Sequence, residues 1–142
     1  MTAADLDVFL YAAMPFMRLL GATAMTASAT EVRLRLEWDP TRCTAGDLLH
    51  GGALMGLADS AAAWCAFLNV PDGATTTTIE SKTNFLRGIR DRYVDAVARP
   101  LHVGRTTIVI DTELRDADDR LVARTTQTQA VLMSRPSPAS RG

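Results

Sequence analysis

One stretch constrains the fold more than any other: residues 50–68, with the sequence HGGALMGLADSAAAWCAFL. Over about five helical turns, apolar residues occupy every angular position, which predicts a helix that is buried on all sides. After the opening His-Gly-Gly, Asp59 and Ser60 are its polar side chains. A carboxylate buried without a partner costs several kcal/mol, and the residues one helical turn from Asp59 can neither neutralise it nor donate to it. Asp59 is therefore predicted either to meet a partner from another segment or to face a cavity that holds a substrate.

The front of this stretch offers backbone hydrogen-bond donors. A helix N-terminus presents unpaired N–H groups and the positive end of the helix dipole. Gly51 and Gly52 have no side chain that would keep a ligand oxygen away from those donors. Such an arrangement can form an oxyanion hole from backbone alone. A donor site followed about two turns later by a lone carboxylate suggests acyl chemistry.

Length and composition describe one ordinary globular domain. The chain has 142 residues, 47% hydrophobic and 22% charged, and we expect a single domain over residues 1–133 with a disordered Pro/Ser-rich tail over 134–142. A net charge of −1 favours neither nucleic acid nor a membrane surface as a partner. The first residues lack the basic segment of a secretory signal, and Asp59 interrupts the longest apolar run, so we expect a cytoplasmic protein.

Several familiar site types are missing from the sequence. The two cysteines, Cys43 and Cys65, form no metal-binding spacing, and no metal site is predicted. Cys65 is expected to be a core residue. Cys43 lies near His50 in sequence and is a conceivable nucleophile, although nothing nearby marks it as a thiolate. The sequence contains no nucleophile elbow, phosphate loop or dinucleotide fingerprint.

The remaining pattern predicts helices followed by an antiparallel sheet. Helical spacing indicates helices over residues 3–13 and 15–21, and strict alternation indicates a strand over 30–38. Consecutive strands joined by short turns imply an antiparallel sheet in an α+β protein. The later strands are expected at 75–86, 92–99 (ended by Pro100), 105–115 and 121–133.

Several segments resemble one family over residues 15–133. They are LHGGALMGLADS, TTTTIESKTNFLRG, the pair Gly104-Arg105 and the early run PFMRLLG. Together they resemble the hotdog-fold acyl-CoA thioesterases of the phenylacetate-degradation (PaaI-like) type. The resemblance implies an antiparallel sheet wrapped around a long central helix. It also implies a homodimer or homotetramer, an acyl-CoA or aryl-CoA substrate of which CoA is a part, and no cofactor.

The resemblance also implies roles for individual residues. Asp59 is the general base or the nucleophile, and these two roles stay open. The N–H of Gly51 is the oxyanion donor, with His50 orienting its loop, and the site joins His50 and Gly51 of one chain to Asp59 of the other. Thr78 helps to hold the attacking water, or Thr77 does if the register slips by one residue. The residues implied to contact the substrate are Gly52, Thr44, Thr77, Asn84, Arg87 and Arg105.

Two departures from the family pattern leave alternatives open. Thr44 stands where the family often has Asn or Gln, and Ala63 stands where some relatives have Ser or Thr. These departures keep a non-catalytic acyl-CoA-binding protein as the alternative. A hotdog dehydratase or hydratase is less well supported, because the second histidine, His102, lies outside any such motif. Asp59 could also be a structural pin, and the glycine pair could serve only a tight helix entry.

Overall fold

The computed structural model describes residues 1–134, so the predicted tail, apart from Ser134, lies outside the described residues. Within residues 1–134, three α-helices, two short 3₁₀ helices and six strands follow one another. The helices are α1 (Ala3–Ala13), α2 (Pro15–Leu20) and α3 (Gly51–Phe67), with η1 (Pro40–Arg42) and η2 (Ala45–Asp47) in the loop before α3. The strands are β1 (Ala22–Ala27), β2 (Val32–Glu37), β3 (Ala74–Phe85), β4 (Tyr93–Val103), β5 (Thr107–Asp116) and β6 (Leu121–Met133).

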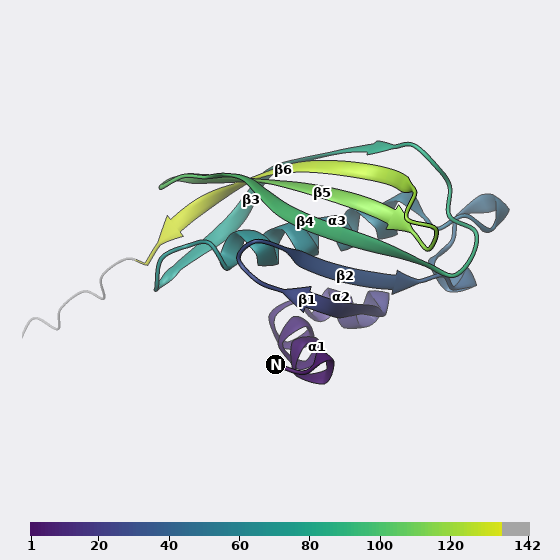
Figure 1. The fold of residues 1–142 in the computed structure, drawn as a ribbon, viewed down its shortest axis with the longest axis horizontal. Helices are drawn as coiled ribbons and strands as arrows, with labels where there is room; N and C mark the ends of the chain where they lie inside the picture. Colours follow the sequence, from purple (N-terminus) through teal and green to yellow (C-terminus); the bar gives the residue numbers. More distant parts are fainter. Residues whose placement is uncertain (135–142) are drawn as a thin grey trace, which may run out of the picture.

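The strands form one antiparallel sheet in the order β1-β2-β4-β5-β6-β3. Helix α3 lies along the concave face of this curved sheet, and α1 and α2 lie beside β1 at one edge (Figure 1). The predicted α+β arrangement, with an antiparallel sheet around one long helix, is therefore observed. Strand β3 forms the other edge, and most of its side chains are exposed.

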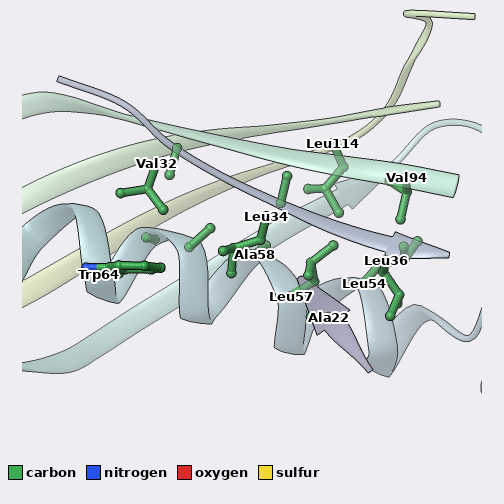
Figure 2. Packing of buried hydrophobic residues seen from close by; sticks show 14 of the residues in the cluster. Ala22, Val32, Leu34, Leu36, Leu54, Leu57, Ala58, Trp64, Val94 and Leu114 are labelled. Carbon is green, nitrogen blue, oxygen red and sulfur yellow. The ribbon is translucent and has the colours of Figure 1, made fainter. Parts of the chain in front are cut away.

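The core lies between α3 and the strands that cross it. The alternation predicted for the second strand is confirmed, because Val32, Leu34 and Leu36 are fully buried. Figure 2 shows these side chains pointing toward Leu57 and Trp64 of α3. Each buried side chain of this size contributes about 1.5–3 kcal/mol relative to an exposed one. This packing fixes the position and direction of α3 relative to the sheet.

Strand β1 is an element that periodicity did not locate. Its sequence, ATAMTA, consists of three alanines, two threonines and one methionine without strict alternation, so it carries little hydrophobic contrast. Side chains of α1 satisfy its outer edge: Asp7 Oδ1 accepts the Ala24 N–H at 2.6 Å, and the Tyr11 hydroxyl donates to the Ala22 carbonyl at 2.7 Å. The covering helix thus protects an otherwise open sheet edge.

Strand β4 continues through Pro100, where the sequence predicted its end. Pairing of β4 with β2 ends at Ala98, and pairing with β5 shifts register between Pro100 and His102. Proline is accommodated in sheets at edges and bulges because it has no N–H to donate. Here it lies past the last residue paired with β2 and directly before a bulge, so the strand extends to Val103.

Helix α3 is not buried on all sides in the single chain, so that prediction is wrong for one chain. The sheet covers one side, and Met55 and Phe67 on another side stay 40% and 45% exposed. Asp59 is half-buried on this same side. We call this face the open stripe of α3; its members, none of them fully buried, are Gly52, Met55, Gly56, Asp59, Ala63 and Phe67.

Candidate active site

The loop before α3 is held so that His50 begins the helix. The His50 N–H donates to the Arg42 carbonyl at 2.9 Å. The Arg42 guanidinium in turn donates from Nε to the Leu20 carbonyl at 2.6 Å and from Nη1 to the Glu37 carbonyl at 3.0 Å. Gly21, with φ +83°, leaves the space for that guanidinium, since a Cβ there would lie 1.9 Å from Arg42 Nη2. Arg42 therefore connects α2, β2 and the start of α3.

The N–H groups of the first turn of α3 are not equivalent. His50 is the N-cap, and its Nδ1 accepts the Gly52 N–H at 2.8 Å. The Ala53 N–H donates to the His50 carbonyl at 2.9 Å. Among the described residues, the Gly51 N–H has no hydrogen-bond partner. The expectation that both glycines offer a donor is thus corrected. The His50 side chain accepts the Gly52 N–H, so only the Gly51 N–H is available to a ligand.

A hollow of about 350 Å³ opens beside Gly51. Thr44, Phe85 and Arg87 line it together with Gly51, so two segments far apart in sequence, residues 44–54 and 85–89, meet here. The Phe85 ring lies close over the helix start, because a Cβ on Gly51 would come within 3.3 Å of its Cζ. The predicted contact residue Asn84 is exposed and does not line this hollow.

Asp59 meets a partner from β3. The Thr78 hydroxyl donates to Asp59 Oδ1 at 3.2 Å. Thr78 pairs with Gln129 of β6, whereas Thr77, the fallback position, is the neighbouring residue in the strand and faces the other way. In this register Thr78 is the threonine that lies beside Asp59.

A bulge in β3 places two site residues on one face. Thr78 and Phe85 are an odd number of residues apart, so a regular strand would point them to opposite faces. The pairing with β6 shifts register between Thr78 and Glu80, which leaves Ile79 as the extra residue. Before the bulge the even-numbered residues of β3 face α3, and after it the odd-numbered residues do. Thr78 therefore lies beside Asp59, and Phe85 lies against Gly51.

Other predicted residues are not brought together within one chain. Gly51 and Asp59 are eight residues apart on one helix, which is about 12 Å along its axis. Arg105 lines a separate hollow of about 650 Å³ at the turn between β4 and β5, together with Val103 and Met133. One chain therefore holds the Gly51 N–H, the Asp59 carboxylate and Arg105 at three separate places.

Cys43 lacks the surroundings of a nucleophile. Its Sγ donates to the Asp39 carbonyl at 3.3 Å. Desolvation raises the pKa of the Cys43 thiol, and the nearby Asp47 and Asp39 carboxylates raise it further. The thiol form is therefore favoured, which argues against this alternative.

Two residues that the sequence did not single out complete the surroundings of Asp59. Gln127 and Gln129 on β6 are 0% and 1% exposed, and both donate to Thr78 Oγ1. Their signal in the sequence is a pair of amides at alternating positions of a strand, where apolar core residues are usual. Residues 1–134 contain no group of three or more His, Cys, Asp or Glu side chains able to hold a metal ion, and no helix there is long and apolar enough to span a membrane.

Comparison with known proteins identifies the family. The model of the family described as "Thioesterase superfamily" matches residues 46–123, more than half of the chain, from η2 to β6. The chain belongs to the thioesterase superfamily.

Several curated proteins are similar to this thioesterase-superfamily chain. Two are named "Putative esterase". The one from Vibrio cholerae is 36% identical over 65% of this chain and 61% of the relative. ComA2 from Bacillus subtilis is 38% identical over 59% of this chain and 68% of the relative. Another is 1,4-dihydroxy-2-naphthoyl-CoA hydrolase of Escherichia coli, 33% identical over 60% of this chain and 62% of the relative. The match thus spans about three fifths of the length of most of these relatives.

Solved structures share the fold of this superfamily member over most of its length. A mutant of thioesterase PA1618 from Pseudomonas aeruginosa has a TM-score of 0.82 and 31% identity, covering 89% of this chain and 93% of that one. Thioesterase HI1161 from Haemophilus influenzae has a TM-score of 0.86 over 94% and 92% of the two chains, at 22% identity, and so shows the fold alone. The predicted hotdog fold is confirmed.

Proposed function

We propose that this chain hydrolyses an acyl-CoA thioester to a free acid and CoA. The observation that carries the proposal is the division of donors at the start of α3, where His50 takes the Gly52 N–H and leaves the Gly51 N–H for a ligand. That N–H would polarise the thioester carbonyl, since a helix N-terminus stabilises a developing oxyanion. Asp59 would act on the same carbonyl, either by activating water or by attacking it directly.

Two chains are needed to assemble this site. A reacting carbonyl must lie about 3 Å from its donor and within about 3.5 Å of its nucleophile, whereas Gly51 and Asp59 of one helix are separated by about 12 Å along its axis. The open stripe of α3 and the exposed edge strand β3, with Ile79 63% exposed, offer a surface for a second copy. We therefore propose a homodimer, or a pair of such dimers, with Gly51 of one chain facing Asp59 of the other.

The remaining predicted residues fit substrate binding in such an assembly. Thr44 and Arg87 line the hollow beside Gly51, where Arg87 could bind a CoA phosphate. Arg105 lies at the other end of the sheet and would reach the same ligand only from the partner subunit. Asn84 is exposed at the end of β3, and the family resemblance implies that it also contacts the substrate.

An aromatic acyl group suits the surroundings of Asp59. A hollow of about 430 Å³ begins one turn after it, at Ala63, and its walls include Phe9, Trp64 and Phe67. Phe9 and Trp64 stack with ring centroids 5.1 Å apart. One relative is named as a hydrolase of 1,4-dihydroxy-2-naphthoyl-CoA, an aryl-CoA. The PaaI-like subtype, a cytoplasmic location and the absence of a cofactor stay predictions.

Free-thiol release from a panel of acyl-CoA thioesters tests the proposal. Benzoyl-, phenylacetyl-, naphthoyl- and hexanoyl-CoA would be compared, and aryl thioesters should be hydrolysed faster than hexanoyl-CoA. Asp59→Asn should abolish turnover while the fold is kept. Binding of these thioesters without release of CoA would instead identify a non-catalytic acyl-CoA-binding protein.

Gly51→Pro tests the oxyanion donor separately. Proline is tolerated at the first position of a helix and lacks the N–H, and His50, with φ −64° and ψ 135°, already has the backbone that precedes a proline. Loss of the donor should reduce kcat about a hundredfold or more. Gly51→Ala is the matched control: it adds a Cβ against Phe85 but keeps the N–H, so it should lose far less. Equal losses would show that contact with Phe85, not the donor, matters.

A further inference from the structure

The hydroxyl of Thr78 has three hydrogen-bond partners, which is as many as a hydroxyl can have. It lies 3.2 Å from Asp59 Oδ1 on one side. On the other side Gln127 Nε2 and Gln129 Nε2 lie at 3.2 and 2.8 Å. The two amides are in the core, whereas Asp59 is on the open stripe of α3. Thr78 thus connects a buried pair of amides to the carboxylate.

The chemistry of these groups determines where each proton lies. An ionised carboxylate only accepts hydrogen bonds, so the single proton of the Thr78 hydroxyl must point to Asp59. The hydroxyl oxygen then has only lone pairs left for its other two neighbours. Both glutamines must therefore present their NH₂ groups to it, as the geometry has them. Only one assignment of donors and acceptors therefore satisfies all three hydrogen bonds of the Thr78 hydroxyl.

We propose that Gln127 and Gln129 are positioning residues that lock the Thr78 hydroxyl as a donor to Asp59. With Oδ1 held in this way, Oδ2, which has no partner among the described residues, is the carboxylate oxygen that acts on water or on the thioester. Thr78 then holds the carboxylate and cannot accept a hydrogen bond from the attacking water. This inference rests on the proposed function of Asp59.

The two amides are difficult to explain by folding alone. The Oε1 atoms of Gln127 and Gln129 are buried and have no partner among residues 1–134. Their cross-strand neighbours on β5 are Ile110 and Ile108, both fully buried. Apolar side chains would satisfy this environment better, because a buried polar atom without a partner destabilises the folded state. A requirement at the site would explain why amides occupy these positions.

Methionine substitutions test the proposal, since methionine has a similar length and no donor. Gln127→Met with Gln129→Met should lower kcat about ten- to a hundredfold by releasing the carboxylate, with KM unchanged. The melting temperature should stay the same or rise, because two unpartnered oxygens are removed. Thr112→Val on β5 is the control: it also removes a buried, unpartnered hydroxyl without touching Thr78, and kcat should not change. An unchanged kcat in the double variant of an active enzyme would overturn the proposal.

A substitution cycle separates positioning from a general effect on the core. In the Thr78→Val background the locked hydroxyl is already absent, so adding the two methionines should cause no further loss of kcat. If the fold-loss of kcat from Thr78→Val and the fold-loss from the two methionines multiply in the combined variant, the glutamines act without Thr78 and the proposal is wrong.

A readout without turnover keeps this inference distinct from the proposed function. In the wild-type protein the side-chain NH₂ groups of Gln127 and Gln129, which are buried and donate to the Thr78 hydroxyl, should exchange slowly and give a resolved NMR signal, which Thr78→Val should change. If the protein hydrolyses no thioester but this signal is present, the proposed function fails while the lock stands. Rapid exchange of these NH₂ protons in the wild-type protein would contradict the lock, whatever the activity.

Discussion

His50 Nδ1 accepts the backbone N–H of Gly52 at 2.8 Å, and this contact distinguishes two adjacent glycines that look alike in the sequence. It caps α3 and holds the imidazole against the helix start. Because Nδ1 is the acceptor, a neutral His50 carries its proton on Nε2. The side chain thus stabilises the helix and leaves Gly51 as the donor for a ligand.

Replacing the cap should lower stability. His50→Ala removes the acceptor for the Gly52 N–H and should reduce the free energy of unfolding by about 1 kcal/mol. His50→Asn supplies another side-chain acceptor at the N-cap and should recover most of that loss. Urea denaturation of the three proteins measures both effects. Equal stability of the Ala variant and wild type would show that the cap contributes nothing.

Mixed dimers should recover activity if the site is shared between chains. Asp59→Asn and Gly51→Pro should each be nearly inactive as homo-oligomers. In a mixed dimer one site carries both defects and the other carries neither. Random pairing makes about half of the dimers mixed, each with one intact site of two, so co-refolding should restore about a quarter of wild-type activity.

Two controls make this experiment decisive. Each variant must fold and assemble alone, as shown by circular dichroism and light scattering, because Gly51→Pro also changes the helix entry. Mixing must be demonstrated with distinct affinity tags on the two variants. If tagged, mixed dimers stay inactive, both residues act within one chain and the interfacial site is wrong.

Two threonines of the core should respond to valine with opposite signs. The Thr112 hydroxyl is buried without a partner in residues 1–134, so Thr112→Val should raise the free energy of unfolding by about 1 kcal/mol. The buried Thr125 hydroxyl is bonded to that of Thr83 at 2.8 Å, so Thr125→Val should lower it by a similar amount. Chemical denaturation of both variants checks the pair, and changes of the same sign would count against this assignment.

The two cysteines should be unreactive in the native protein. Burial raises the pKa of the Cys65 thiol to about 11 and also raises that of Cys43, so both stay protonated at pH 8. Ellman's reagent should label neither thiol at that pH until the protein is unfolded. Because the Cys65 thiol returns to its ordinary pKa of 9.0 on unfolding, its contribution to stability is complete below pH 9 and is lost as the pH rises toward 11. Rapid native labelling would mean that the thiols are accessible thiolates.

The sequence alone determined the elements whose residues carry strong local signals. The alternation around Val32 and Leu34, the unbroken apolar helix and the turns between later strands were enough to predict an α+β protein with one long helix. These signals suffice because helix and strand periodicity follows directly from which side chains must be buried. The anomaly of Asp59 was visible for the same reason, since a charge in an apolar run requires a partner.

Only the tertiary structure decided the features that depend on neighbours far away in sequence. Strand β1 and the passage of β4 through Pro100 depend on a covering helix and on a bulge. The bulge at Ile79 depends on pairing with β6, and it changes which β3 side chains face α3. Register and bulges arise from contacts between strands, so no local pattern reports them.

The same limit applies to the site. The sequence placed Gly51, Gly52 and Asp59 on one helix, but the imidazole of His50 decided which N–H is available. The sequence also showed two polar residues, Gln127 and Gln129, in a strand. Only the fold revealed that both donate to the Thr78 hydroxyl, which lies beside Asp59. Hydrogen bonds between distant segments depend on the direction of each side chain, and packing sets that direction only once the whole chain has folded.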